Sequence, residues 1–328
     1  MLFMKFYTAV FDHPKRLFVL VGKLVSNYMS IGINPFENVI IAPLFLSEPM
    51  RRIYAAWRCG EIDFRLPLRS VIMDSGGYQV QTGKVSFDAL CVRLMHIWKS
   101  EQWADYYVLP DHVPKSSDTD FEVERKVGDT LRAGERFLKF LPKDKEAIGV
   151  VHGRNLLQVL RCVRQWQSLG VSYLAFGSFG TSGPYGSVNL ISNRSLRLLR
   201  AVSDEVASHN LKLHVFGISY PSYVRLLVRN GIRVASVDSA GWWKAASYRQ
   251  IFFDGAPQRF VPTARSARGT RKGVLSVEGI ENEKQRTGHD CPFCRRPDLL
   301  DDRINLALHN LIVTVDSIRK VCYDNASE

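Results

Sequence analysis

The stretch AIGVVHGRNLLQVLRCVRQWQSLGVSYLAFGS, residues Ala147–Ser178, contains one complete strand–helix–strand unit. Its two ends are short apolar runs that each close on a glycine or a polar residue. Its middle, Leu156–Leu169, carries apolar residues at three-to-four spacing, which predicts an amphipathic helix. Runs that are apolar throughout are typical of parallel strands covered on both faces. The stretch therefore predicts two parallel strands joined by a helix.

The same alternation recurs along most of the chain. The strand candidates are NVIIAPLF (38–45), SVIMD (70–74), YYVLPD (106–111), AIGVVHG (147–153), SYLAFGS (172–178), LKLHVFGIS (211–219) and RVASVD (233–238). The helix candidates are Phe87–Lys99, Asp120–Phe140, Leu156–Leu169, Asn193–Ser208 and Ser222–Asn230. Seven strand runs in 328 residues suit a (β/α)₈ barrel. We expect an α/β protein with a single TIM-barrel domain over residues 1–328. A doubly wound open sheet is the alternative, because periodicity does not distinguish closed sheets from open ones.

The chain carries an excess of positive charge, with 44 Lys and Arg against 32 Asp and Glu and a formal net charge of +12. Such an excess attracts polyanions, although solubility alone is an alternative explanation. Basic residues gather in RSARGTRK, residues Arg265–Lys272. Bases could stack on aromatic residues just upstream, namely Trp242, Trp243, Tyr248, Phe252 and Phe253. Nucleic acid is therefore the expected partner.

The N-terminal segment MLFMKFYTAVFDHPKRLFVLVGKLV, residues 1–25, is apolar and basic, as targeting segments often are. Asp12, Lys15, Arg16 and Lys23 interrupt its apolar runs, and no convincing cleavage site follows. No apolar run approaches the length that spans a bilayer. We expect a soluble, cytoplasmic protein without a membrane partner.

Nearly every strand candidate ends in a polar residue or a glycine. These residues are Asp74, Asp111, His152 with Gly153, Gly177 with Ser178, Gly217 with Ser219, and Asp238. In a parallel barrel the carboxyl ends of the strands gather on one face, where active sites are built. A single Asp after a strand often only begins a turn or caps a helix. Three acids in this repeated position predict a shared site.

Three carboxylates at a barrel mouth suit two kinds of chemistry. They can bind a hard cation, but Mg²⁺ sites usually include phosphate or further oxygen ligands, and no Walker-type loop occurs in the sequence. They can instead act at a glycosidic carbon, where one acid attacks as nucleophile and another group handles the leaving group's proton. A third acid could accept hydrogen bonds from an amino-bearing heterocycle. Backbone N–H groups beside Gly177 could donate to its carbonyl oxygen.

Several of these segments, in this order, resemble the tRNA-guanine transglycosylase family. The segments are DSGGYQ (74–79), PDHVPKSSD (110–118), GVVHG (149–153), AFGSFG (175–180), VFGIS (215–219), VDSAGWW (237–243), HDCPFC (289–294) and LHNL (308–311). The resemblance covers about Asn38 to Lys320. Members of the family are (β/α)₈ barrels that exchange a guanine in nucleic acid for a 7-deazaguanine base, without ATP or a redox cofactor.

The resemblance implies a role for each matching residue. Asp238 would be the nucleophile that attacks C1′ and expels guanine, and Asp74 the acid/base group. Asp111 would bind the amidine-like edge of the purine. The base-binding residues implied are Ser75, Gly76, Tyr78, Asp111, His152, Gly177, Ser178 and Gly217. His152 replaces the family's usual glutamine, so a purely structural histidine is the alternative there. Tyr78 replaces a phenylalanine and still allows stacking.

Two of the six cysteines are closely spaced in HDCPFC. His289, Cys291, Cys294 and the more distant His309 supply four ligands for a tetrahedral zinc ion. The family has a cysteine where this chain has His289, and the substitution keeps a closed set of four. We expect a structural Zn²⁺ in a subdomain at about residues 279–320. A disulfide or two chance thiols is the alternative.

The resemblance leaves the nucleic-acid substrate open between DNA and tRNA. The segments FGS and VDSAGW are closer to those of the archaeal tRNA enzymes, which use the base preQ0. Those enzymes continue into an RNA-binding C-terminal extension, which we do not expect here. The chain is similar to the DNA-guanine transglycosylases of phages and bacterial DNA-modification clusters. We expect DNA as substrate and a preQ0-like 7-deazaguanine base as co-substrate, and a homodimer is possible. The alternatives are a tRNA enzyme of the archaeosine or queuosine type, a non-catalytic nucleic-acid-binding barrel, and a nucleosidase that uses water.

Overall fold

Eight parallel strands close into a barrel in this computed structural model, which describes residues 4–10, 12–27, 31–177, 192–218, 220–256, 258–264 and 272–324. Each strand pairs with its sequence neighbours, and the last pairs with the first. The strands are β1 Lys5–Ala9, β2 Asn38–Ile41, β3 Ser70–Met73, β4 Tyr106–Val108, β5 Glu146–Val151, β6 Tyr173–Phe176, β7 Lys212–Val215 and β8 Ser236–Ser239. The predicted (β/α)₈ barrel is confirmed, and the open-sheet alternative is wrong.

The strand that closes the barrel is β1, which the sequence pattern does not reveal. It lies in the apolar N-terminal segment and is only five residues long. Its partner on one side is β8, at the far end of the chain, with Tyr7 opposite Asp238. Closure therefore depends on a pairing between residues more than 200 positions apart, which local periodicity cannot register.

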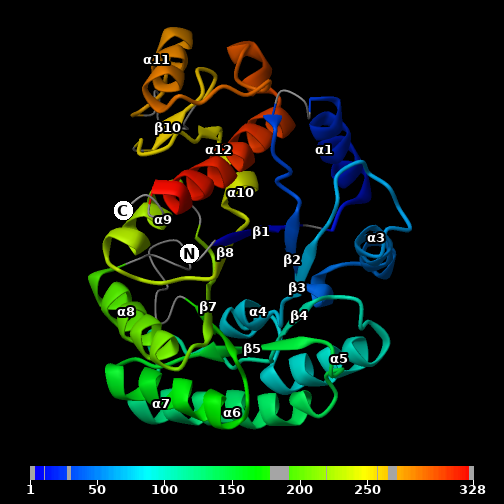
Figure 1. Ribbon diagram of the computed structural model, residues 1–328, viewed down its shortest axis with the longest axis vertical. Helices are drawn as coiled ribbons and strands as arrows, with labels where there is room; N and C mark the ends of the chain where they lie inside the picture. The colour runs from blue at the N-terminus through cyan, green and yellow to red at the C-terminus, as the bar shows by residue number, and fades with distance from the viewer. Residues whose placement is uncertain are drawn as a thin grey trace.

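Helices follow the strands and cover the barrel (Figure 1). They are α1 Pro14–Ser26, α3 Glu48–Arg58, α4 Gly77–Gln81, α5 Phe87–Ser100, α6 Asp120–Leu138, α7 Leu156–Ser168, α8 Asn193–Ser208, α9 Pro221–Arg229, α10 Gly241–Ser247, α11 Val277–Thr287 and α12 Arg303–Asp324. The five predicted helices are confirmed to within two residues at each end. Side-chain caps set several starts: Asn155 accepts a hydrogen bond at the start of α7, and Thr119 forms a capping box with Glu122 at α6.

The predicted first strand run, residues 38–45, is shorter than expected. Strand β2 ends at Ile41, and Pro43 begins a 3₁₀ turn, η1 Pro43–Phe45. Proline has no N–H to donate to a sheet, so it ends the ladder there. A second 3₁₀ turn, η3 Pro297–Asp301, precedes the last helix.

The last helix, α12, packs against α9, α10 and α1 and so takes the place of the eighth barrel helix. The segment between β8 and α12 contains α10, an antiparallel pair of two-residue strands, β9 Gln250–Ile251 and β10 Arg259–Phe260, and α11. In Figure 1, α11 and β10 lie beyond α12 from the barrel strands. The segment between α10 and α12 thus forms an addition to the barrel. None of the helices in the described ranges is long and apolar enough to cross a membrane.

The barrel interior is filled by one layered cluster of buried side chains. Its members are Tyr7, Ile40, Ile72, Val108, Ile148, Val150, Tyr173 and Ala175. A larger cluster lies between the strands and the helices. Because side chains alternate along a strand, Asp74 lies on the same side of β3 as Ile72. By the same alternation, Asp238 and Ser236 share one face of β8. The sequence pattern therefore directs two of the acids into the mouth of the barrel.

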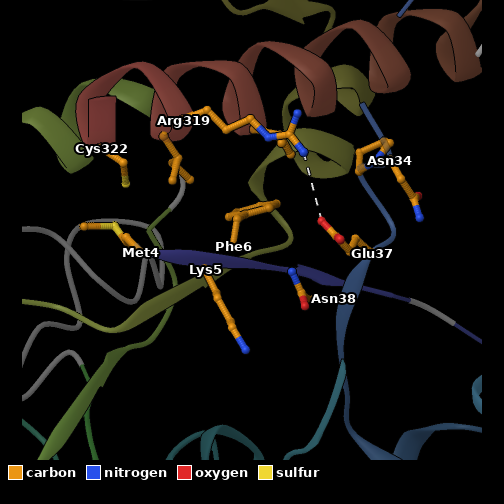
Figure 2. Close-up of a pocket in the computed structure, with 11 residues that line it drawn as sticks. Met4, Lys5, Phe6, Asn34, Glu37, Asn38, Arg319 and Cys322 are labelled. Carbon is orange, nitrogen blue, oxygen red and sulfur yellow. Dashed lines mark ion pairs between the residues drawn. The ribbon is translucent and has the colours of Figure 1, made fainter. Parts of the chain in front are cut away.

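The opposite, N-terminal face of the barrel has a cavity of about 340 Å³ between β1, the segment before β2 and α12 (Figure 2). Glu37 and Arg319 face each other across it at 4.0 Å. Lys5 and Asn38, the first residues of their strands, also line it. This cavity is at the end of the barrel away from the three acids, and it is no part of their site.

Candidate active site and metal centre

The structure brings Asp74, Asp111 and Asp238 together at the mouth of the barrel. Asp74 directly follows β3, Asp111 lies three residues after β4, and Asp238 lies within β8. The negative charges of Asp111 and Asp238 both act on Asp74 and raise its pKa. Side chains separated by 164 residues in the sequence are therefore close enough to influence one another's ionisation. The expected convergence of these acids is confirmed, and their roles remain predictions.

Asp74 has a strongly perturbed carboxyl group. Burial raises its pKa from 3.8 to about 7, with further contributions from Asp111 and then Asp238. The backbone N–H groups of Gly76 and Ser75 act in the opposite direction, because they donate to the carboxylate. Near neutral pH, Asp74 therefore populates both protonation states. It can donate a proton and accept one at the same pH, as acid/base catalysis requires.

Asp111 is held in one orientation by its neighbours. The Ser75 hydroxyl donates to Oδ1 at 2.6 Å, and Nε2 of His152 lies 3.0 Å from Oδ2. A Cβ atom on Gly77 would lie only 2.2 Å from Oδ1, so only glycine fits against this carboxylate. Gly76 adopts a left-handed conformation, with φ of 81°. The two glycines of the DSGG motif are thus needed for different reasons, Gly76 for its left-handed backbone and Gly77 for its close approach to Asp111.

His152 lies at the base of this arrangement and is almost fully buried, at 2 % exposure. It contacts the carboxylate of Asp111, so it supports the residue that is expected to bind the purine edge. That contact gives the buried imidazole a partner at Nε2. Direct contact with a base remains a prediction.

The other expected base-binding residues lie around the same mouth. Tyr78 is on α4 with 44 % of its surface exposed, so its ring is accessible for stacking. Gly177 directly follows β6, and a Cβ there would meet no atom of the described residues within 4 Å. Ser178 lies outside the described residues, as does most of the basic run Arg265–Lys272. The predictions for Ser178 and for the basic run therefore remain predictions.

The contacts that the described residues make with the Asp238 carboxylate are all on one oxygen. Its Oδ1 accepts a hydrogen bond from the backbone N–H of Gly217 at 2.9 Å and lies 3.2 Å from Nε2 of His214. Within the described part of the chain no residue donates to Oδ2. Gly217, which was expected to bind the base, therefore has a contact that the sequence did not predict. The contacts of the described residues therefore fix Oδ1 of Asp238.

Sequence reasoning missed His214. It stands in the middle of the run LKLHVFGIS, in strand β7, and it is fully buried. A histidine inside an otherwise apolar strand was the available signal, because a buried imidazole must find hydrogen-bond partners. Its other ring nitrogen, Nδ1, lies 2.5 Å from the hydroxyl of Ser236 on the neighbouring strand β8.

A basic cavity of about 630 Å³, here called the α6 cavity, is lined by residues of α4, α5 and α6 and of the loop after β4. Its lining includes His112 and five cationic side chains, Lys115, Arg125, Lys126, Arg132 and Arg136. Asp129 pairs with Arg125 at 3.0 Å and with Arg132 at 2.7 Å. The cations outnumber the two acids in the lining, Asp88 and Asp129, so the cavity favours an anion.

The aromatic residues expected to stack on bases have different surroundings. Trp242, Phe252 and Phe253 are buried, at 1 %, 3 % and 4 % exposure, so they belong to the core and the stacking prediction is wrong for them. Tyr248 is exposed. The ring of Trp243 lies between two guanidinium groups, those of Arg303 at 4.3 Å and Arg16 at 5.5 Å from its centroid.

The candidate metal centre is a buried group of four side chains between α11 and α12. The donor atoms of His289, Cys291, Cys294 and His309 all lie within 4.8 Å of one another. The two sulfur atoms are 3.5 Å apart, near the roughly 3.8 Å expected for two ligands on one tetrahedral zinc ion. Both cysteines are free thiols, so the disulfide alternative is wrong. The four residues could hold a metal ion.

Neighbouring groups orient these donors. Nε2 of His309 donates to the carbonyl of Phe252 at 2.9 Å, which leaves Nδ1 as the ligand atom, 3.5 Å from Cys291 Sγ. Nε2 of His289 is buried and has no hydrogen-bond partner within the described ranges, as expected of a ligand atom. Hydrogen bonding from Cys291 and the nearby His309 lower the pKa of the Cys294 thiol, which favours the thiolate that binds metal.

Comparisons with known proteins assign no family to this chain. Searches against protein-family models and against curated proteins both gave no match. The functional reading therefore depends on the site and on the ordered motifs.

Proposed function

We propose that this chain is a guanine transglycosylase that exchanges guanine in nucleic acid, preferably DNA, for a preQ0-like 7-deazaguanine base. The observation that carries the proposal is the set of three carboxylates in one barrel mouth, each in a different state. Asp238 has one oxygen to which no described residue donates, Asp74 has a pKa of about 7, and Asp111 is fixed by Ser75 and His152. A nucleophile, an acid/base group and a rigid acceptor are the parts that base exchange needs.

In the first step, Oδ2 of Asp238 attacks C1′ of the target nucleotide. The bond between C1′ and N9 breaks, its electron pair goes to N9, and protonated Asp74 supplies the proton that makes free guanine. The product is an ester between Asp238 and the sugar. In the second step, N9 of the incoming base gives its proton to Asp74 and attacks C1′, and Asp238 leaves as a carboxylate. Asp238 and Asp74 thus act in both steps, and the exchange consumes no other reactant.

The electrostatics of the mouth suit this sequence of steps. The charge of Asp238 helps to keep Asp74 protonated, because it contributes to the raised pKa. Forming the ester removes that charge, so the pKa of Asp74 falls after guanine has been protonated. Asp74 is then biased toward the ionised form that accepts a proton from the incoming base.

A polyanionic substrate is supported by the charge of the protein and by where that charge lies. The formal net charge is +12. The lining of the α6 cavity includes His112, directly after Asp111 in the chain, and the ring of Trp243, five residues after Asp238, contacts the guanidinium groups of Arg16 and Arg303. The preference for DNA over tRNA rests on the resemblance to the DNA-modifying branch. In duplex DNA the target base must leave the stack to reach the mouth.

The metal centre is best explained as a structural zinc site. Two thiols and two imidazoles are the donor set that zinc prefers, and all four protein ligands leave no open position for a substrate. His309 belongs to α12, which packs along the barrel, so a bound ion would tie the segment after α11 to the barrel.

The proposal is tested by supplying a labelled preQ0 base with guanine-containing DNA or tRNA and analysing the digested nucleosides by mass spectrometry. We expect the label in DNA, an equal amount of released guanine, and loss of both in Asp238→Asn. Label in tRNA instead would identify the RNA enzyme. Guanine released without incorporation would indicate a nucleosidase. Binding without either product would identify a non-catalytic barrel.

A further inference from the structure

A chain of buried hydrogen bonds runs from Asp238 into the barrel. It passes from Asp238 Oδ1 to Nε2 of His214 at 3.2 Å, from Nδ1 of His214 to Oγ of Ser236 at 2.5 Å, and from Ser236 to the hydroxyl of Tyr173 at 2.5 Å. Three strands, β6, β7 and β8, supply one member or more each. His214 and Ser236 are both fully buried.

The chemistry of the groups gives the chain a direction. An ionised carboxylate only accepts, so Nε2 of His214 carries the proton that points at Asp238. In the neutral imidazole, Nδ1 then accepts a hydrogen bond from the hydroxyl of Ser236. The oxygen of Ser236 in turn accepts from Tyr173. Burial raises the pKa of Tyr173, so the phenol keeps its proton and remains the donor at the end of the chain.

The surroundings of His214 leave it few other partners. The rings of Tyr7 and Phe216 pack edge-on against it, with centroids 6.2 Å and 4.6 Å away. Asp238 and the tyrosine hydroxyls are the titratable groups that face it from β8, β1 and β6. Tyr173 also lines a cavity of about 550 Å³ at the N-terminal ends of the strands. The hydrogen bonds therefore connect the nucleophile to the opposite end of the barrel.

We propose that His214 is a positioning residue for Asp238, and that Ser236 and Tyr173 hold it in the neutral tautomer with the proton on Nε2. This inference rests on the proposed function, because it gives Asp238 its role as nucleophile. The two donors, His214 and Gly217, fix Oδ1 and direct Oδ2 at C1′. When Asp238 leaves in the second step, the returning negative charge on Oδ1 meets two hydrogen-bond donors already in place.

A purely structural role is the alternative, since any buried polar group needs partners. The two roles predict different results for removing a hydroxyl from the chain. If the contacts only satisfy buried groups, removal costs stability and leaves the imidazole as it was. If they fix the tautomer, removal changes the protonation pattern of His214 and slows base exchange.

The experiment uses the full-length protein labelled with ¹⁵N-histidine, in wild-type form and as Ser236→Ala, Tyr173→Phe and Tyr7→Phe. Tyr7→Phe is the matched control, because it also removes one buried hydroxyl inside the barrel, whose partner at 2.8 Å is Ser70 rather than the chain. NMR of the ring nitrogens reports the tautomer without any substrate. We expect His214 as a single Nε2–H tautomer in the wild type and in Tyr7→Phe.

In Ser236→Ala we expect the Nδ1–H form or the imidazolium of His214 to appear. We also expect kcat for guanine exchange to fall about tenfold relative to Tyr7→Phe, which is the order of losing the charge-assisted hydrogen bond from His214 to Asp238. Tyr173→Phe should fall between the two. A wild-type His214 protonated on Nδ1, or an unchanged tautomer and rate in Ser236→Ala, would overturn the positioning role. Absence of exchange by the wild type would instead reject the proposed function, and the ring-nitrogen spectra would still decide the tautomer.

Discussion

Replacing Asp74 by Asn should stabilise the protein, and the gain should grow with pH. In the folded chain the pKa of Asp74 is raised to about 7, by burial first and then by Asp111 and Asp238. In the unfolded chain it returns to its ordinary value of 3.8. The wild type is therefore penalised wherever the unfolded chain would ionise this group and the folded chain resists doing so.

The sign follows from which state binds the proton more tightly. Below pH 3.8 both states hold the proton and Asp74 costs nothing. As the pH rises from 3.8 through about 7, the unfolded chain ionises Asp74 before the folded chain does, so the free energy of unfolding falls. A pKa rise from 3.8 to about 7 corresponds to about 4 kcal/mol, at about 1.4 kcal/mol per pKa unit. Because Asn cannot ionise, it avoids this cost.

The assay is urea unfolding of wild type and Asp74→Asn between pH 4.5 and 8, followed by circular dichroism. The difference in free energy of unfolding should be small at the acid end and approach about 4 kcal/mol in favour of the variant above pH 7. Asp111→Asn is the matched control. It should destabilise the protein at neutral pH, because it replaces a carboxylate that two neighbours contact. A flat difference between the variant and the wild type across this pH range would refute the reasoning.

Three further predictions concern the loop, the metal centre and the basic cavity. Gly77→Ala should cost about 2–3 kcal/mol of stability and weaken base binding, since its Cβ would lie 2.2 Å from Asp111 Oδ1; urea unfolding measures the first and titration with guanine the second. Chelation, or Cys294→Ser, should lower the thermal unfolding temperature and release about one zinc per chain, measured by calorimetry and elemental analysis. Arg136→Glu should weaken binding to a DNA oligonucleotide and make the salt dependence shallower, as followed by fluorescence anisotropy at several salt concentrations.

Each of these has a control in the same region. Gly177→Ala adds a methyl group at the same mouth, where no atom of the described residues lies within 4 Å of it, so it should leave stability unchanged. Cys162→Ser changes a buried thiol outside the metal centre and should not alter zinc content. Lys139→Glu reverses a charge at the end of α6, outside the cavity lining, and should affect DNA binding less than Arg136→Glu. Equal effects within any pair would contradict the corresponding prediction.

The fold was largely predictable because a short stretch of sequence is enough to identify each βαβ unit. The run Ala147–Ser178 shows why: its helix begins at the Asn155 cap, and its two strands are apolar on both faces. Strand β1 was not predictable in the same way. Its residues alternate poorly, and its pairing with β2 and β8 makes them a strand.

The candidate site shows the same division. Asp74, Asp111 and Asp238 could be found, because the ends of parallel strands meet whatever the loops do. The contacts between them could not be found. The approach of Gly77 to Asp111, and the chain from Asp238 through His214 to Tyr173, depend on how neighbouring strands are staggered. The stagger of neighbouring strands cannot be predicted from a short stretch of sequence.

The central claim is that Asp238 forms a covalent bond to the sugar of a target nucleotide. The most direct test mixes the protein with a guanine-containing DNA oligonucleotide in the absence of any incoming base, quenches the reaction with denaturant, and measures the intact mass. The account predicts a protein–DNA adduct that maps to Asp238, with one guanine released for each adduct. Adduct formation by Asp238→Asn, or guanine release by the wild type with no adduct under any quench time, would contradict it.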